Sequence, residues 1–219
     1  MPNNPGTLYA NVHRSFQQFS GQPRGYLLGM SLSEYRRKRP SGRSPEPPAR
    51  PGRERRGNDA PGFVIQHHAA RGDHYDVRLE IDGVLPSWAV PKGPATNQTN
   101  PKDKRMARRT EDHPLGCATF KGVIPKDAYG AGGVIVWDRG TYANATDREM
   151  PEVLERGHLS FRLYGEKLRG GYALTRIPEG KDETSLLVKR KDEDADARRK
   201  PVKSQPESVL SGRTLDELS

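Results

Sequence analysis

The stretch Gln66-His67-His68-Ala69-Ala70-Arg71-Gly72-Asp73-His74-Tyr75-Asp76-Val77-Arg78-Leu79-Glu80 decides the fold of this chain. From His74 onward polar and apolar residues alternate, which is the two-residue period of a β-strand. We expect the apolar face of this strand to lie on a core. The other face carries His74, Asp76, Arg78 and Glu80. Four of the six histidines fall between residues 67 and 113, so we expect an active site here.

His68 precedes His74 by six residues, and residues 69–73 are expected to form the turn that brings the two together. His67 has the opposite parity to His68 and is expected to face away. Two imidazoles and the Asp76 carboxylate suffice to bind a divalent transition metal and leave positions for water and substrate. Without a thiolate, these ligands suit Mn²⁺, Fe²⁺ or Zn²⁺. A hydrogen-bonded polar face without metal is the alternative interpretation.

A phosphate-binding role is suggested by the cations that follow. Arg78 lies two residues beyond Asp76, about 6–7 Å along the strand, where a guanidinium can clamp phosphate oxygens. Lys92 and Arg105 could add to this charge, although such residues in loops are more often solvated. His113 could hydrogen-bond a phosphate or protonate a leaving alkoxide, or it is a partly buried structural histidine.

The composition favours a soluble protein with an acidic partner. Hydrophobic residues make up 32% of 219 residues and the mean hydropathy is −0.92, so part of the chain is expected to lack a packed core. The net charge of +9 favours nucleic acid as partner. The single cysteine, Cys117, excludes an internal disulfide, and no apolar run approaches the roughly 20 residues that span a bilayer. We expect a cytoplasmic, nucleoid-associated monomer with no membrane contact.

Four segments are expected along the chain. Residues 1–29 are polar and expected to be disordered. Residues 30–60 form a basic arm rich in Pro and Arg, which is either a solvated linker or a nucleic-acid contact, with a short helix over residues 32–39. Residues 61–190 form the catalytic β domain. Residues 191–219 are a charged tail, expected to dock in part through Ser208-Val209-Leu210.

Short strands dominate residues 61–190. We expect them at residues 63–66, 74–81, 84–90, 106–113, 134–137, 159–164, 171–177 and 185–189. Asp82-Gly83 is typical of a two-residue hairpin turn, Asp138-Arg139-Gly140 is expected to end its strand, and residues 150–156 are expected to form a helix stopped by Gly157. About eight strands with one or two short helices predict a mainly β fold, a compact antiparallel barrel.

Several motifs together resemble the 3′-phosphoesterase domain of bacterial DNA ligase D, in a stand-alone form. They are Phe63-Val64-Ile65-Gln66-His67-His68-Ala69-Ala70, His74-Tyr75-Asp76-Val77-Arg78-Leu79-Glu80, Ser87-Trp88-Ala89-Val90-Pro91-Lys92-Gly93-Pro94, Glu111-Asp112-His113-Pro114-Leu115 and Tyr129-Gly130-Ala131-Gly132. The resemblance runs from about Leu32 to Thr214.

This resemblance implies a manganese-dependent enzyme of DNA repair by non-homologous end joining. Such an enzyme removes a 3′-terminal ribonucleoside from a primer-template as a phosphodiesterase. It then removes the remaining 3′-phosphate as a phosphomonoesterase and leaves a 3′-OH. The implied partners are DNA or DNA/RNA 3′ ends, together with a separately encoded DNA ligase, repair polymerase and end-binding protein.

The resemblance also implies roles for individual residues. The metal would be bound by His68, His74 and Asp76, and catalysis would involve His74, Arg78 and His113. Substrate binding would add Gln66, Lys92, Arg105, Glu111, Arg39 and Glu46. Two positions depart from the family: Pro40 replaces an aspartate, and Gly116 and Cys117 stand where a tyrosine is common. Two alternatives remain: a non-catalytic DNA-end-binding module that recruits a ligase or polymerase, and a metal-dependent ribonuclease that cleaves within RNA.

Overall fold

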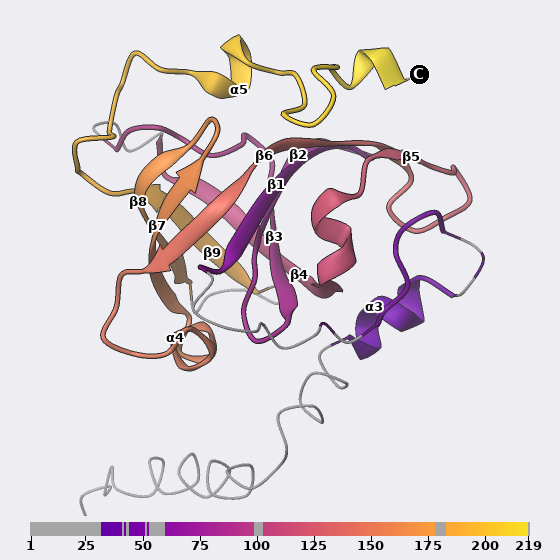
Figure 1. Cartoon of the computed structure of the whole chain (residues 1–219), viewed down its shortest axis with the longest axis horizontal. Helices are drawn as coiled ribbons and strands as arrows, with labels where there is room; N and C mark the ends of the chain where they lie inside the picture. The colour runs from indigo at the N-terminus through magenta and orange to yellow at the C-terminus, as the bar shows by residue number, and fades with distance from the viewer. Residues whose placement is uncertain are drawn as a thin grey trace, which may run out of the picture.

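A closed antiparallel barrel forms the body of the protein (Figure 1). The computed structural model describes residues 32–40, 42, 44–50, 52, 60–98, 103–177 and 183–218, so the disorder expected for residues 1–29 lies outside them. The described strands form one sheet in the order β1-β2-β3-β4-β9-β8-β7-β6-β5, and β6 also pairs with β1. Eight strands therefore close the barrel, β5 is added beside β6, and the predicted fold class is confirmed.

The strands are β1 (Gly62–Ala69), β2 (Asp73–Leu79), β3 (Val84–Val90), β4 (Arg105–Pro114), β5 (Gly122–Ile124), β6 (Gly132–Asn144), β7 (His158–Gly165), β8 (Arg169–Arg176) and β9 (Thr184–Lys189). The helical segments are α3 (Ser33–Lys38), η2 (Leu115–Thr119), α4 (Met150–Arg156), α5 (Pro201–Ser204) and η3 (Asp216–Leu218). All of these helical segments lie outside the barrel, with α4 and α5 near opposite ends (Figure 1).

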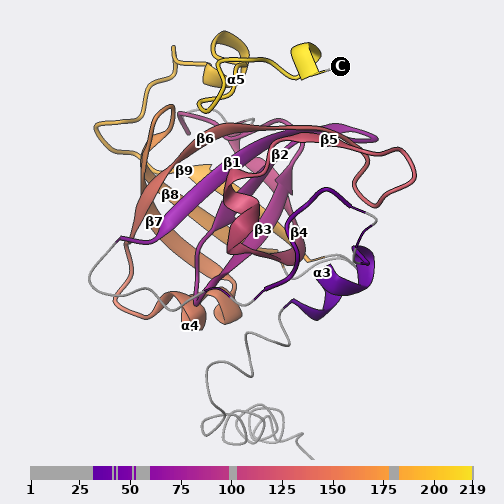
Figure 2. The same ribbon diagram turned by 45° about the vertical axis from the view of Figure 1, so that its right-hand side comes forward.

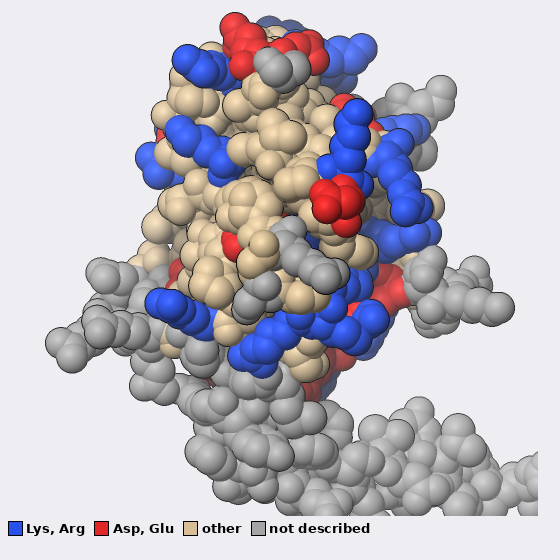
Figure 3. All heavy atoms as spheres, turned by 90° about the vertical axis from the view of Figure 1, so that its right-hand side faces the viewer, with Lys and Arg blue, Asp and Glu red and all other residues tan. Residues whose placement is uncertain are grey.

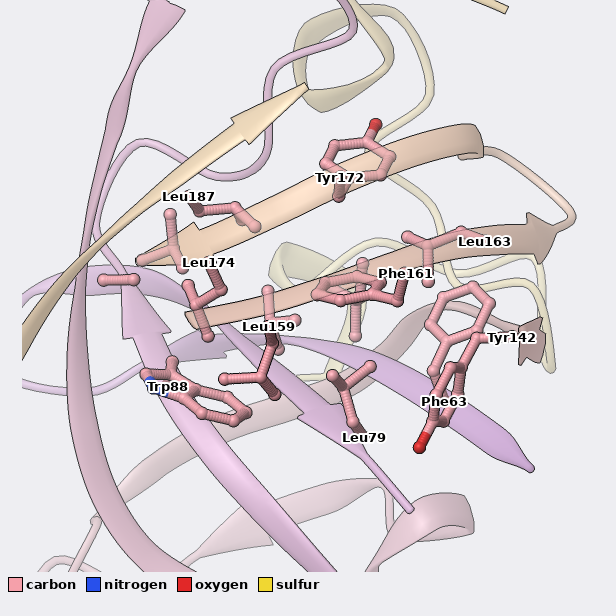
Figure 4. Close-up of a cluster of buried hydrophobic side chains, with 14 of the residues drawn as sticks. Phe63, Leu79, Trp88, Tyr142, Leu159, Phe161, Leu163, Tyr172, Leu174 and Leu187 are labelled. Carbon is pink, nitrogen blue, oxygen red and sulfur yellow. The ribbon is translucent and has the colours of Figure 1, made fainter. Parts of the chain in front are cut away.

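The interior of the barrel is apolar. Tyr75, Val77 and Leu79 point inward from β2, as their parity predicts, and join a buried cluster that includes Trp88 and Phe161. Figure 4 shows side chains of this cluster converging from several strands. Burial of each large apolar side chain contributes about 1.5–3 kcal/mol, so this cluster fixes which face of each strand points inward. The opposite parity of β1 to β4 is thereby directed to the outer surface.

The turn between β2 and β3 sets the register of the outer face. Asp82 and Gly83 have φ angles of 52° and 78°, the left-handed pair that a tight hairpin of this kind requires. The register pairs Arg78 with Ser87 and Asp76 with Ala89. The Asp82-Gly83 turn is therefore confirmed. It places the hydroxyl of Ser87 beside Arg78 and only a methyl group beside Asp76.

Strand β6 runs further than predicted. The sequence Asp138-Arg139-Gly140 does not end it, because β6 continues to Asn144 and pairs with β7. The Asp138 carboxylate instead accepts bonds from the backbone N–H groups of Arg139, Glu166, Lys167 and Leu168. A Cβ atom at Gly140 would lie 2.1 Å from the Tyr164 carbonyl oxygen, so this glycine permits close strand pairing. Both residues therefore support pairing with β7.

The described part of the basic arm packs on the barrel. Leu32 and Tyr35 are buried, and the Tyr35 hydroxyl donates to the Pro47 carbonyl oxygen at 2.7 Å. The helix α3 therefore depends on tertiary contact, since its N-cap Leu32 makes no side-chain cap. Figure 2 shows the arm and η2 over the outer face of β3 and β4. A wholly solvated linker was the wrong interpretation for these residues.

The carboxyl-terminal tail contacts β6 at Val136 and Trp137. The Ser208 hydroxyl and the Val209 N–H both donate to the Val136 carbonyl oxygen, at 2.9 and 3.0 Å. Trp137 Nε1 donates to the Gln205 carbonyl oxygen at 2.8 Å. The tail thus adds backbone and side-chain bonds along the outer edge of β6.

Candidate metal centre and phosphate site

A cavity of about 670 Å³ lies on the outer face of the barrel. Strands β1 and β2 contribute Gln66, His68, His74, Asp76 and Arg78 to its wall. Further lining residues come from other segments: Arg39 and Glu46 from the arm, Glu111 and His113 from β4, and Tyr129 and Gly130 from the loop before β6. Nine predicted site residues therefore meet in one cavity.

His68, His74 and Asp76 form a compact cluster. The register places His68 directly opposite His74, so the turn over residues 70–72 folds the chain back as predicted. The His68 Nδ1 lies 3.7 Å from Asp76 Oδ2, and the His74 Nε2 lies 3.6 Å from Asp76 Oδ1. One ligand atom from each residue lies within 4.8 Å of the others. These distances exceed hydrogen-bond lengths and suit three ligands around one ion.

Backbone carbonyl groups fix which nitrogen of each imidazole faces the cluster. His68 Nε2 lies 2.8 Å from the Gly130 carbonyl oxygen, and His74 Nδ1 lies 2.8 Å from that of Gly72. A carbonyl oxygen only accepts hydrogen bonds, so each of these nitrogens carries the proton. The other nitrogens therefore turn lone pairs toward Asp76. This is the outer-shell arrangement of metal-ligating histidines, and the residues present fit a divalent cation.

Arg78 is buried beside the cluster with three of its N–H groups directed to described side chains. Its Nε donates to Gln66 Oε1 at 2.8 Å, its Nη1 to Ser87 Oγ at 2.8 Å and its Nη2 to Asp76 Oδ2 at 2.9 Å. Gln66 in turn donates to the carbonyl oxygens of Cys117 and Phe120. A guanidinium fixed in this way is preorganised, and it brings positive charge to the cavity wall.

The charge on Arg78 also controls the ionisation of Asp76. Burial opposes the charged form of this carboxylate, yet the neighbouring Arg78 guanidinium holds the pKa of Asp76 well below its ordinary value. Asp76 is therefore an anion across the physiological range. Anionic carboxylate and neutral imidazole are the protonation states that bind a divalent cation.

His113 is buried next to Ser87, the residue that accepts a bond from Arg78. Its Nδ1 donates to the Glu111 carbonyl oxygen at 2.8 Å, while its Nε2 lies 3.4 Å from Arg39 Nη2. Burial and the nearby charges of Arg78 and Arg39 hold the pKa of His113 well below its ordinary value. The ring is therefore neutral and presents a lone pair to Arg39. In this state His113 is not a proton donor at Nε2.

Arg39 connects the arm to β4 through two carboxylates. Its Nε donates to Glu46 Oε2 at 2.5 Å and its Nη1 to Glu111 Oε1 at 2.6 Å. Lys38 Nζ bonds the second oxygen of Glu111 at 2.9 Å. Burial favours the neutral form of Glu111, but its bonds with Arg39 and Lys38 lower its pKa overall. Arg39, Glu46 and Glu111 are thus brought together at the wall of the cavity.

Lys92 and Arg105 lie elsewhere in the structure. They line a second cavity of about 100 Å³, together with Arg199, Lys200 and Lys203. Arg105 Nε donates to the Gly93 carbonyl oxygen at 3.1 Å. The structure therefore does not bring Lys92 and Arg105 into the cavity with the histidines, and their contact with substrate stays a prediction.

Sequence reasoning missed several contributors to the site. Ser87 bonds Arg78, and the carbonyl groups of Gly72 and Gly130 orient the histidines. The Ser87 contact was available from the sequence, because a two-residue turn at Asp82-Gly83 pairs residue 78 with residue 87. The carbonyl group of Gly130 carries no side-chain signal and comes from a segment about 60 residues away.

One face of the protein is rich in basic side chains (Figure 3). Figure 3 shows many Lys and Arg side chains along one side and the lower part of this face, with fewer Asp and Glu. Such a distribution favours contact with a polyanion.

Among the described residues, no helix has the length and apolar character needed to cross a membrane.

Comparison with known proteins agrees with this geometry. Residues 66–176 match the family described as the DNA ligase D 3′-phosphoesterase domain. The chain is 49% identical over 190 residues to the multifunctional non-homologous end joining protein LigD of Pseudomonas aeruginosa, covering 84% of this chain and 22% of that protein. It is 47% identical over 148 residues to the corresponding DNA repair protein of Mycobacterium tuberculosis, covering 66% of this chain and 18% of that protein.

The fold and the site define a β-barrel protein with a candidate metal and phosphate site on its outer face. The matched region contains His68, His74, Asp76, Arg78 and His113. The chain belongs to the DNA ligase D 3′-phosphoesterase domain family. It spans about a fifth of the length of the relatives that it matches.

Proposed function

We propose that this protein is a manganese-dependent 3′-end-processing phosphoesterase. It removes a 3′-terminal ribonucleoside from a primer-template and then the 3′-phosphate, leaving a 3′-OH. The observation that carries this proposal is the His68, His74 and Asp76 cluster, whose two inner imidazole nitrogens face the carboxylate within 3.7 Å beside the buried Arg78. Family membership supports the reaction class.

A divalent cation bound by His68, His74 and Asp76 would polarise a phosphoryl oxygen as a Lewis acid. Arg78 supplies a fixed positive charge for the phosphate, because Gln66, Ser87 and Asp76 restrain its guanidinium from three sides. This charge opposes the negative charge that develops on phosphoryl oxygens during hydrolysis. The guanidinium charge is already positioned by these three bonds and needs no rearrangement at that moment.

His113 has a role that depends on the substrate. In the free protein its ring is neutral, with its proton on Nδ1 and its Nε2 toward Arg39. The negative charge of a bound phosphate raises the pKa of a nearby imidazole. His113 would then take a proton on Nε2 and donate a hydrogen bond to a phosphate oxygen.

The proposed biological setting is supported by the relatives, which are named as non-homologous end joining proteins. We propose that the substrate is a DNA or DNA/RNA 3′ end in this repair process. A DNA ligase, a repair polymerase and an end-binding protein would act on the same ends. The protein would act as a monomer in the cytoplasm, in association with the nucleoid.

The test uses two labelled primer-templates, one ending in a single ribonucleotide and one ending in a 3′-phosphate. Each is incubated with purified protein and Mn²⁺ and analysed on a denaturing gel. We expect the first to shorten to a 3′-phosphate and then to a 3′-OH, and the second to lose its phosphate. Unchanged strands together with intact DNA binding would contradict hydrolysis and support the non-catalytic end-binding module. Products from cleavage within RNA would support the ribonuclease alternative.

A further inference from the structure

The cavity is larger and less uniform than a phosphate group needs. Its volume of about 670 Å³ falls within the range of pockets that enclose whole small molecules. One wall carries the charged cluster and Arg78, while the end of β5 and the loop between β5 and β6 line another part with Ile124, Lys126, Ala128 and Tyr129. A phosphate at the charged wall would leave the space beside this loop for a flatter group.

Tyr129 is the notable residue of that loop. Its side chain is 49% exposed, and of the exposed large hydrophobic residues it alone, within the described part of the chain, lines this cavity. Lys38 Nζ and Arg39 Cζ both lie over its ring, 4.8 Å and 5.2 Å from the ring centre. Because about half of the side chain stays exposed at the edge of a phosphate site, its open part has the chemistry of a platform for a nucleobase.

The loop is fixed with respect to the metal cluster. Two successive turns shape it, with N–H to carbonyl bonds from Ala128 to Pro125 at 3.0 Å and from Ala131 to Ala128 at 3.2 Å. Gly130, the neighbour of Tyr129, accepts the bond from His68 Nε2 at 2.8 Å. A Cβ atom at Gly130 would lie 4.0 Å from Arg39 Nη2. The ring of Tyr129 is therefore attached to a segment that directly contacts His68, one of the candidate metal ligands.

We propose that Tyr129 stacks on the base of the 3′-terminal nucleoside while the adjoining phosphate lies at the His68, His74, Asp76 and Arg78 wall. This inference rests on the proposed function and specifies how the departing nucleoside is bound. Stacking uses the face that every base has, so the subsite would accept all four bases. Lys38 and Arg39 add positive charge beside the nucleotide.

The test measures how much the terminal base contributes to binding. Two labelled primer-templates end in the same ribose, one with its base and one abasic, and affinities are measured by fluorescence anisotropy without divalent metal, so that strands stay intact. Stacking contributes about 1–3 kcal/mol per base, so we expect the wild type to bind the base-containing end about 10-fold more tightly. Tyr129→Ala should abolish this ratio, and Tyr129→Phe should preserve it because the ring is retained.

Tyr164→Ala is the matched control. Tyr164 is 52% exposed but lines a separate hollow on the outer surface of β1, β6 and β7, so its loss should leave the ratio at its wild-type value. The affinity of Tyr129→Ala for the abasic end reports whether the rest of the site is intact. A wild type without base preference, or a Tyr129→Ala variant that keeps it, would overturn the proposal.

Failure of the proposed function gives a different result. The same wild-type protein is incubated with Mn²⁺ and analysed on a gel. Base-dependent binding without shortened strands would refute hydrolysis and retain the stacking subsite. Shortened strands without base-dependent binding would refute the stacking subsite alone.

Discussion

Asp76 and Asp138 are both buried aspartates, but their carboxylates face different surroundings. Four backbone N–H groups donate to the two oxygens of Asp138 at 2.9 to 3.0 Å, so this carboxylate organises a turn. Asp76 accepts from Arg78 through Oδ2, and its Oδ1 faces the His74 lone pair at 3.6 Å across the cavity. A buried carboxylate therefore does not by itself identify a metal site. The metal site is identified by several acceptor atoms that converge on one cavity.

The pKa values of the two carboxyl groups are shifted in opposite directions. Burial raises the pKa of Asp138, even though four N–H groups favour its charged form. Burial acts against ionisation of Asp76 as well, but the full charge of Arg78 outweighs it and the pKa falls. A neighbouring cation thus keeps an anion in the cavity, where it can bind a metal.

Substituting asparagine at each position separates the two roles, and we expect the largest effect at Asp76. Asp76→Asn removes the anionic ligand, so the rate on a 3′-phosphate should fall by about 100-fold or more, since metal polarisation is worth several kcal/mol. Asp138→Asn sets an amide N–H₂ against the Leu168 N–H and should lower the free energy of unfolding by about 2 kcal/mol. Rate assays on folded protein and urea unfolding measure both. Equal loss of activity in the two variants would contradict the comparison.

Gln66 tests whether orientation of Arg78 matters apart from the metal. Gln66→Leu removes the acceptor of Arg78 Nε and the bonds to Cys117 and Phe120. We expect kcat to fall roughly 10- to 100-fold, as for other supporting residues of metal sites. Mn²⁺ affinity should be unchanged, because Gln66 makes none of the contacts that orient the two imidazoles. A matched loss of metal binding would show that Gln66 acts on the ligands instead.

Arg39 is a buried charge that, unlike Asp76, is expected to hold the arm on the barrel. Its side chain is 7% exposed and joins Glu46 to Glu111, so Arg39→Ala removes the buried cation that these two carboxylates share and leaves Glu111 with Lys38. This should cost about 3 kcal/mol of arm docking and speed proteolysis within residues 32–52 on the order of 100-fold. Arg198, which is largely exposed and bonds Asp196, provides a control. Arg198→Ala should leave the proteolysis rate unchanged, and an unchanged rate in Arg39→Ala would contradict the buried role.

The smallest expected effect is a pH dependence of arm docking. The pKa of Glu111 is lowered, so its bonds to Arg39 and Lys38 stabilise the docked arm fully above the ordinary glutamate value near 4.5. This stabilisation is lost as the pH falls through the lowered pKa. Protection from an acid-active protease should therefore decrease between pH 5 and 3. In Glu111→Gln the decrease should be smaller, and an identical profile would assign the transition to another group.

The sequence predicted the barrel and the central cluster because both depend on local patterns. The two-residue period of a strand places Tyr75 and Val77 on one face of β2 and His74 and Asp76 on the other. Short turns fix how β1, β2 and β3 pair. The length of β6 was not predictable from these patterns. Asp138 and Gly140 resemble a turn until β7 supplies their partners.

Long-range contacts limited prediction of the site. The sequence of the arm is basic and proline-rich, and nothing local indicates that Arg39 would lie between Glu46 and Glu111. Lys92 and Arg105 were grouped with the site as additional positive charge and by resemblance, but the structure places them at another cavity. The second wall with Tyr129 depends on how the loop before β6 folds over His68, which only the three-dimensional structure specifies.

The central claim is that His68, His74 and Asp76 together hold one divalent cation. Titration of the metal-free protein with Mn²⁺, followed by electron paramagnetic resonance of free ion, tests it directly. We predict one bound ion per chain in the wild type and loss of that binding in His74→Ala, with Tyr164→Ala unaffected. Absence of Mn²⁺ binding by the wild type, or equal binding by His74→Ala, would contradict the account.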